Sequence, residues 1–359
     1  MGSPSSRPVL GVVGATGAVG RVIRSCLPMF RHLWGEVRLC AEESHVGRTV
    51  SVAVEKLTVQ PLTEEFFDGI DVALVDLPPS LTEQWVERAV ARGVVVIDNS
   101  TIFRAWEEVP LVVAEVNPEE VANRPLGIIA NPGATVMTMI DALGVLHRGW
   151  GLHSLVVTTF QAASGMGRKG IVRLYDEVEA VAGQRDLAQR PGDIRRLIED
   201  KLGEESCFPA PLALNVIPFV GGPRDDGWTT EEAKLRDETR KILGLPDLKV
   251  MATCVRVPVI SAHSISVHAT FSRPLEVERA RRALVEAPMV VLMDHPDLEF
   301  PTPVDVVGAD PRFIGRLRQS PDFPRSLDFF VSGDNLRKGA GLNMLQTAEL
   351  VLRDLGFST

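Results

Sequence analysis

The sequence has few cysteines and no cluster of metal-ligating residues. Its four cysteines, Cys26, Cys40, Cys207 and Cys254, lie far apart in the chain. No CxxC pair is present, so their spacing predicts neither a zinc site nor a disulfide framework. We expect reduced, buried thiols and no bound metal.

Tyrosine and long apolar runs are also scarce, and acidic residues outnumber basic ones. The 359 residues include one tyrosine and carry a net charge of −9. This acidic balance argues against a general surface for nucleic acid or anionic membranes. No uncharged run is long enough to span a membrane, and the N-terminal stretch MGSPSSRP has no apolar signal core. We therefore expect a cytoplasmic protein with neither a nucleic-acid nor a membrane partner.

Strand-like and helix-like runs alternate over the first 150 residues. The apolar, strand-like runs are 9–13, 37–40, 71–77, 94–98, 111–116 and 127–130, and residues 81–92 have helical spacing. Such alternation predicts a Rossmann-like, doubly wound parallel sheet. We expect a nucleotide-binding domain formed by residues 1–133 and a C-terminal helix at about 338–359.

The pattern changes in the second half of the chain. The strand candidates there are 152–163, 251–259, 264–271 and 327–331, and the helix candidates are 168–182, 230–243 and 276–286. We interpret residues 134–337 as a second domain of mixed α+β type, and its expected roles in substrate binding and dimerisation follow only from the family resemblance given below. The fold class is therefore α/β, with a second, mixed domain.

The stretch GATGAVG follows the first strand and opens a helix. Its glycines, Gly14, Gly17 and Gly20, allow the backbone to approach a pyrophosphate at the helix N-terminus. The same spacing also occurs in a tight turn that binds nothing. A second strand-turn-helix corner, NPGATVM, starts at Asn131 and has Ala134 where many enzymes place a nucleophile.

Four charged or titratable positions are candidates for a polar site, each with a simpler structural explanation. Arg104 ends the stretch DNSTIFR, and an arginine there binds phosphate or carboxylate, or lies on the surface. Glu231 and Lys234 share one face of a helix, which is otherwise a solvated charged face. Arg256 needs an anion if it is buried, and His263 is either an acid/base or structural.

Taken together, these residues resemble aspartate-semialdehyde dehydrogenase. The resemblance covers nearly the whole chain in order, through the stretches GATGAVG, DNSTIFR, EVNP, QAASGMG, EEAK, CVRVPVISAHS and SGDNLRKGAGLNMLQTAE. It implies a homodimer and the production of aspartate semialdehyde from L-aspartyl-4-phosphate with NADPH. In that reaction a cysteine attacks the acyl phosphate, and hydride then reduces the thioester.

The resemblance also implies a role for each candidate residue. Arg104 and Lys234 would hold the phosphate, Arg256 the α-carboxylate and Glu231 the α-ammonium. Gln161 would orient the acyl group, and His263 would be the acid/base. The cofactor would lie against Gly14, Thr16, Gly17, Ala18, Val19, Gly20, Ser164, Gly165 and Asn335.

Three departures from the family pattern concern the redox half of the reaction. Ala134 stands at the position of the nucleophilic cysteine, so no thioester can form there. Glu42 and Glu43 stand in the loop that would bind a 2′-phosphate, and an acid there better suits a ribose diol. Pro78 and Pro79 remove backbone donors from a loop near the cofactor. Binding of NAD or NADP is therefore an open question at this stage.

Three functions are consistent with this pattern. The first is a repurposed enzyme that transfers the acyl group of aspartyl phosphate, or of a close analogue, to an amine without hydride transfer. The second is an NAD(P)-dependent dehydrogenase whose cysteine was replaced to trap a complex. The third is a non-catalytic binding or scaffold protein. Cys254 as a substitute nucleophile is a further hypothesis, although a structural role for it is favoured.

Overall fold

The computed structural model describes residues 7–52, 54–295 and 299–358, which form two compact units. Unit 1 contains the chain up to Gly144, the segment Asp237–Asp247, and the chain from Leu336 onward. Unit 2 contains Val145–Arg236 and Leu248–Asn335. The first division between the units lies at Gly144, and the segment Asp237–Asp247, which contains the last part of one helix, belongs to unit 1.

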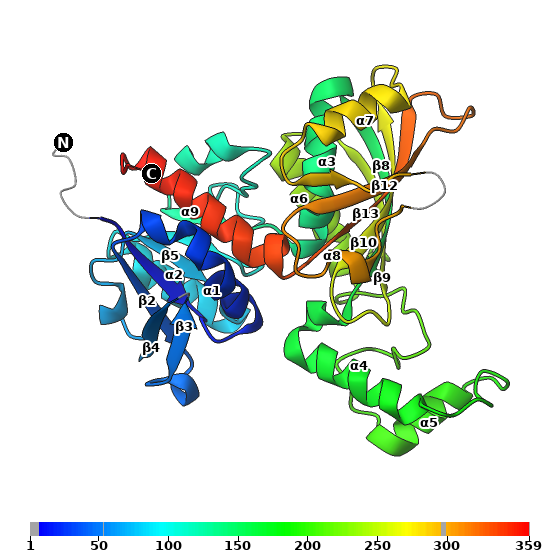
Figure 1. The fold of residues 1–359 in the computed structure, drawn as a ribbon, viewed down its shortest axis with the longest axis horizontal. Helices are drawn as coiled ribbons and strands as arrows, with labels where there is room; N and C mark the ends of the chain where they lie inside the picture. Colours follow the sequence, from blue (N-terminus) through cyan, green and yellow to red (C-terminus); the bar gives the residue numbers. More distant parts are fainter. Residues whose placement is uncertain (1–6, 53, 296–298, 359) are drawn as a thin grey trace. The chain divides into compact units, whose positions relative to one another are not determined.

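Unit 1 is built on a seven-stranded sheet in the order β3-β4-β2-β1-β5-β6-β7 (Figure 1). The strands are β1 (Val9–Val13), β2 (Glu36–Ala41), β3 (Thr49–Val52), β4 (Glu55–Pro61), β5 (Val72–Val75), β6 (Val95–Asp98) and β7 (Ile128–Ala130). All neighbouring pairs are parallel except β3 with β4. The chain leaves β1 toward one edge and returns to β5 on its other side. The carboxyl ends of β1 and β5 therefore flank a topological switch point, where α/β proteins bind ligands.

Unit 1 also contains several α-helices, some of them only in part. They are α1 (Ala18–Phe30), α2 (Pro79–Val90), the first part of α3 (Ala134–Trp150), the last part of α6 (Thr230–Leu243), and α9 (Leu342–Asp354). Helix α1 buries Ile23, Cys26 and Leu27 at the three- and four-residue spacing of one helix face. It packs against α9, so the C-terminal helix joins the domain formed by the start of the chain.

The strand expected at 111–116 is absent, and this prediction was wrong. Leu111, Val112 and Val113 are buried as their apolar character suggests, but only Leu111 forms an isolated bridge. The Asn117 side chain accepts a hydrogen bond from the Val113 N–H and donates one to the Leu111 carbonyl. An asparagine side chain thus satisfies backbone groups that a neighbouring strand would otherwise pair.

Unit 2 contains a six-stranded mixed sheet in the order β11-β12-β13-β10-β8-β9. The strands are β8 (Leu152–Gln161), β9 (Lys249–Arg256), β10 (His263–Phe271), β11 (Val290–Leu292), β12 (Arg312–Arg318) and β13 (Ser326–Gly333). The helices that lie wholly within it are α4 (Gly167–Val181), α5 (Asp193–Leu202), α7 (Val277–Val285) and α8 (Pro303–Val306). The α/β fold class with a second, mixed domain is confirmed.

Several elements have no clear signal in the sequence. The strand β12 reads RFIGRLR, whose three arginines and glycine interrupt the alternation of apolar residues. The helix α5 buries only Ile198, so its helical period is nearly invisible. Within the described residues, no helix has the length and apolar character that crossing a membrane requires.

Candidate active site

Two parallel strands of unit 2 place their last residues side by side. β8 ends at Gln161 and β9 ends at Arg256, and the two residues are partners in the register. Both side chains are buried. The Arg256 guanidinium donates from Nη1 to the Ala162 carbonyl at 2.7 Å. The sheet thus holds the Gln161 amide and the Arg256 guanidinium next to each other at the carboxyl ends of β8 and β9.

Glu231, on α6, approaches the same carboxyl ends of β8 and β9. Gln161 Nε2 lies 3.4 Å from Glu231 Oε1 and 3.3 Å from Thr159 Oγ1. The carboxylate of Glu231 also opposes the lowering of the Arg256 pKa that burial causes. A half-buried carboxylate and a buried guanidinium in one cluster suit a zwitterion, since each end of such a ligand meets its counter-charge. The roles that the resemblance implies for Glu231 and Arg256 stay a prediction.

His263 begins β10 and is buried beside Arg256. Its Nδ1 accepts a hydrogen bond from the Ala162 N–H at 3.1 Å. Burial, assisted by the charge of Arg256, lowers the pKa of His263 to about 3. The imidazole is therefore neutral, and its proton is on Nε2, because Nδ1 is the acceptor. The resemblance implies that His263 acts as an acid or a base. In the resting protein, this tautomer presents Nε2–H as a hydrogen-bond donor.

The buried state of His263 predicts a pH dependence of stability. The unfolded chain binds a proton near pH 6.5, whereas the folded chain resists protonation down to about pH 3. Stability from this group is complete above pH 6.5 and falls as the pH decreases, by about 2 kcal/mol at pH 5. Urea unfolding at several pH values should show this loss in the wild type and a smaller one in His263→Gln. Parallel curves for the two proteins would contradict the buried neutral imidazole.

Ser164, Gly165 and Asn335 lie against this cluster. Asn335 Oδ1 accepts hydrogen bonds from Ser164 Oγ at 3.0 Å and from the Ala262 N–H at 3.1 Å. Its amide NH2 group is thereby oriented as the donor. A Cβ atom on Gly165 would lie 2.7 Å from Arg256 Nη1 and 3.5 Å from His263 Nε2. Glycine at this position therefore leaves room for the side chains of Arg256 and His263.

Lys234 stands one helical turn after Glu231 on α6 and is half-buried. Among the residues that the structure describes, no hydrogen-bond or ion-pair partner contacts its ammonium group. A half-buried ammonium without an anion is a suitable group for binding phosphate.

Unit 1 holds the second group of predicted residues, around the start of α3. Ala134 is the first residue of this helix. Arg104 donates from Nη2 to the Asn99 carbonyl and from Nη1 to Glu238 Oε1, while its buried Nε has no partner among the described residues. Glu238 Oε2 accepts the Gly133 N–H at 2.6 Å. Glu238 thus links the Arg104 guanidinium to the N-terminus of α3, where Ala134 presents a methyl group.

Glu238 is a site residue that the sequence analysis missed. The Glu238 carboxylate contacts both Arg104 and the backbone N–H of Gly133, although Glu238 lies more than 100 residues after each of them in the sequence. A Cβ on Gly133 would lie 2.9 Å from Arg104 Nη1 and 3.1 Å from Glu238 Oε2, so a larger residue there would displace the ends of these two side chains. The available signal was the seven-residue spacing from Glu231, which places both acids on one helix face.

Cys254 and Cys40 are poor substitutes for a thiol at position 134. Burial raises the pKa of Cys254 to about 12 and also raises the pKa of Cys40 above its ordinary value. Both therefore stay protonated at neutral pH, and a protonated thiol is a poor nucleophile. Cys26 is buried in the helix packing of unit 1, and Cys207 is half-buried in unit 2. This favours the structural reading of Cys254.

The glycine-rich loop lies between β1 and α1. Gly14 has φ +84°, and a Cβ there would lie 2.2 Å from the Asp76 carbonyl oxygen. Gly17 is the N-cap of α1, which then starts with Ala18 and Val19. A Cβ on Gly20 would lie 2.2 Å from the Gly14 carbonyl oxygen. Two of the three glycines are therefore required by close backbone packing, whether or not a nucleotide binds.

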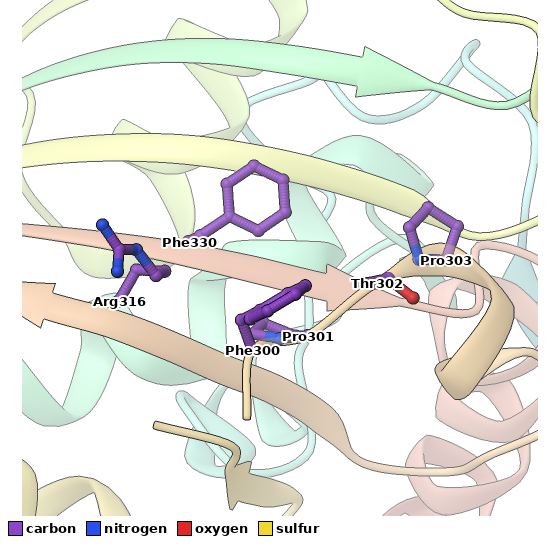
Figure 2. Close-up of a pocket in the computed structure, with 6 residues that line it drawn as sticks. All are labelled: Phe300, Pro301, Thr302, Pro303, Arg316 and Phe330. Carbon is purple, nitrogen blue, oxygen red and sulfur yellow. The ribbon is translucent and has the colours of Figure 1, made fainter. Parts of the chain in front are cut away.

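A hollow on unit 2 contains none of these residues. It is lined by Phe300, Pro301, Thr302, Pro303, Arg316 and Phe330 (Figure 2). Phe330 and Arg316 project from β13 and β12, on a face of the sheet that also exposes apolar residues of β8 and β9. The hollow is therefore separate from the polar cluster at the ends of β8 and β9.

Comparison with known proteins identifies the family. Residues 9–124 match the semialdehyde dehydrogenase NAD binding domain, and residues 143–338 match the semialdehyde dehydrogenase dimerisation domain. The chain is 41% identical to the aspartate-semialdehyde dehydrogenase of Streptomyces akiyoshiensis, over 96% of this chain and 99% of that protein. The chain belongs to the aspartate-semialdehyde dehydrogenase family. This confirms the resemblance found in the sequence.

Other members of the aspartate-semialdehyde dehydrogenase family agree over the same length. The Bacillus subtilis enzyme is 36% identical, covering 94% of this chain and 95% of that protein. The structure of aspartate semialdehyde dehydrogenase II from Vibrio cholerae, complexed with ASA, has a TM-score of 0.88 and 34% identity. It covers 98% of this chain and 99% of that chain. The family comprises enzymes of the dehydrogenase kind, in amino-acid metabolism.

Proposed function

We propose that this protein binds L-aspartyl-4-phosphate, or a close analogue, and transfers its acyl group to an amine without hydride transfer. The observation that carries the proposal is a set of charged residues that is retained although the position of the family's nucleophile has lost its thiol. The buried Arg256 and the half-buried Glu231 remain in one cluster of unit 2, while Ala134 of unit 1 offers only a methyl group. An acyl phosphate is already activated, so a bound amine can replace the thiol of the family's reaction.

Each retained residue has a defined role in this proposal. Arg256 binds the α-carboxylate, and Glu231 binds the α-ammonium. Arg104 and Lys234 bind the phosphate group. Gln161 and the Nε2–H of His263 act on the acyl oxygen, where they stabilise the negative charge that develops during attack. These assignments follow the family pattern, and the burial and hydrogen bonds described above support them.

The reaction balances without a redox partner. The amine nitrogen forms a bond to the acyl carbon, and the bond from that carbon to the phosphate oxygen breaks. The proton that the amine loses leaves on the departing phosphate as hydrogen phosphate. His263 returns to its starting state, since it only donates a hydrogen bond during the addition. The products are an amide of aspartate and phosphate.

Product analysis by mass spectrometry tests this proposal. Aspartyl phosphate is generated in situ with an aspartate kinase and mixed with the protein and a panel of amines, with and without NADH or NADPH. We expect a protein-dependent amide that needs no nicotinamide. His263→Ala should lower its rate by about 100-fold or more, as loss of one oxyanion donor does. His153→Ala, which changes an exposed histidine of β8, is the matched control and should leave the rate unchanged.

The other two functions predict different products. A trapped dehydrogenase would form no amide and would recover its activity when a cysteine is restored. A binding or scaffold protein would bind the acyl phosphate without any turnover. We also propose that the protein is a homodimer, supported by the match to the family's dimerisation domain and by the exposed apolar residues Val156 and Met251 on neighbouring strands of unit 2.

A further inference from the structure

Asp76 lies at the switch point of the unit 1 sheet, opposite the glycine-rich loop. It follows β5 directly, and the Gly14–Gly17 loop follows β1, whose last residue is in register with the last residue of β5. Asp76 Oδ2 lies 3.7 Å from the position that a Cβ on Gly17 would take. A carboxylate therefore faces the N-cap of α1, which is the end of the helix that binds a pyrophosphate in dinucleotide-binding folds.

A chain of amide side chains holds this carboxylate in place. Asn99 Nδ2 donates to Asp76 Oδ1 at 2.9 Å, and Asn131 Nδ2 donates to Asn99 Oδ1 at 2.9 Å. Asn131 in turn accepts a hydrogen bond from Asn343 Nδ2 at 2.8 Å. Because each amide is fixed by the next, Asp76 cannot easily turn away from the loop.

The position of Asp76 opposes a dinucleotide for a simple electrostatic reason. The positive end of the α1 dipole favours an anion, and Asp76 supplies one from within the chain. A pyrophosphate at the same place would bring two further negative charges next to this carboxylate, in a partly buried environment where screening is weak. The loop alone would fit the cofactor, but the loop together with Asp76 does not.

Two neighbouring features act in the same direction. Helix α2, which begins three residues after Asp76, has Pro78 as N-cap and Pro79 as its first residue, so two backbone donors are missing. On the adenosine side, Thr16 Oγ1 lies 2.8 Å from His45 Nδ1, and Glu42 lies 3.2 Å from the same atom. This contact engages the Thr16 hydroxyl within the protein and keeps an acid where a 2′-phosphate would bind.

We infer that the switch point of the unit 1 sheet excludes the diphosphate of NAD and NADP, and that the Asp76 carboxylate is the specificity-determining group. The nucleotide-binding fold of the family is then retained for its structure and not for a dinucleotide. This inference agrees with the proposed function, but it does not depend on it, because it concerns binding in the absence of any acyl phosphate.

Titration calorimetry with NADH and with NADPH at pH 8 tests the inference on the full-length protein. We expect the wild type to bind both more weakly than about 1 mM. Asp76→Asn keeps the shape of the side chain and removes its charge, so it should bind NADH at least tenfold more tightly. Asp68→Asn, which changes an exposed acid before the start of β5, controls for total charge and should behave as the wild type.

Two results would overturn the inference. One is micromolar binding of NADH or NADPH by the wild type. The other is unchanged weak binding in both Asp76→Asn and Asp76→Ser, with thermal unfolding showing that at least one of them is folded. Neither result bears on whether an amide forms from aspartyl phosphate, so this test and the test of the proposed function can fail independently.

Discussion

Replacing Arg256 by methionine should lower kcat/KM for the acyl phosphate by about a thousandfold. The guanidinium is buried and donates a hydrogen bond to the Ala162 carbonyl, and it is attracted by the nearby carboxylate of Glu231. Methionine fills a similar volume but leaves Glu231 without its counter-charge and removes the donors for a carboxylate. The loss should therefore concern both substrate binding and the position of the acyl group.

Two further variants make this measurement specific. Arg256→Lys keeps the charge but not the forked geometry, so we expect it to recover only part of the activity. Arg279→Met changes an exposed arginine of α7 and should leave kcat/KM within twofold of the wild type, as surface changes usually do. A wild-type value for Arg256→Met, in a protein with an unchanged melting temperature, would remove Arg256 from the site.

Introducing a cysteine at position 134 should create a reactive thiol without restoring a dehydrogenase. The first residue of α3 lies at a helix N-terminus next to Gly133, where the helix dipole lowers the pKa of a thiol. Aspartyl phosphate should therefore acylate Ala134→Cys stoichiometrically, and intact-protein mass spectrometry should detect the thioester. The wild type should show no such adduct.

Hydride transfer is the step that should remain absent in this variant. If Asp76 excludes the dinucleotide, Ala134→Cys alone should not oxidise aspartate semialdehyde in the presence of phosphate and NAD or NADP. The double variant Ala134→Cys/Asp76→Ser should show the first measurable oxidation. Full activity in the single variant would instead identify a dehydrogenase that lacks only its cysteine, and it would contradict the proposed acyl transfer.

Much of the fold followed from the sequence because its signals are local. β1 and α6 have the expected limits, since each is a continuous run with the period of its own structure. The strand expected at 111–116 failed because Asn117 pairs with the backbone there, and no propensity indicates that side-chain contact. The strand β12 was missed because its arginines interrupt the alternation.

The sequence indicated which residues form the candidate site, but not how their side chains contact one another. The resemblance indicated Arg104, Gln161, Arg256 and His263, and the structure places the last three in one buried cluster of unit 2. Glu238 was not expected, although it contacts both Arg104 and Gly133. Its role depends on two hydrogen bonds across more than 100 residues, and such pairs leave no periodic pattern.

The sequence by itself determined the family, the α/β fold class and the alanine at position 134, because these depend on residue types and their order. The tertiary structure decided which nitrogen of His263 carries the proton, and that Asp76 faces the N-cap of α1. Both facts depend on the direction of a hydrogen bond and on burial. These arise only when distant segments pack together, as the ends of β1 and β5 do at the switch point of the unit 1 sheet.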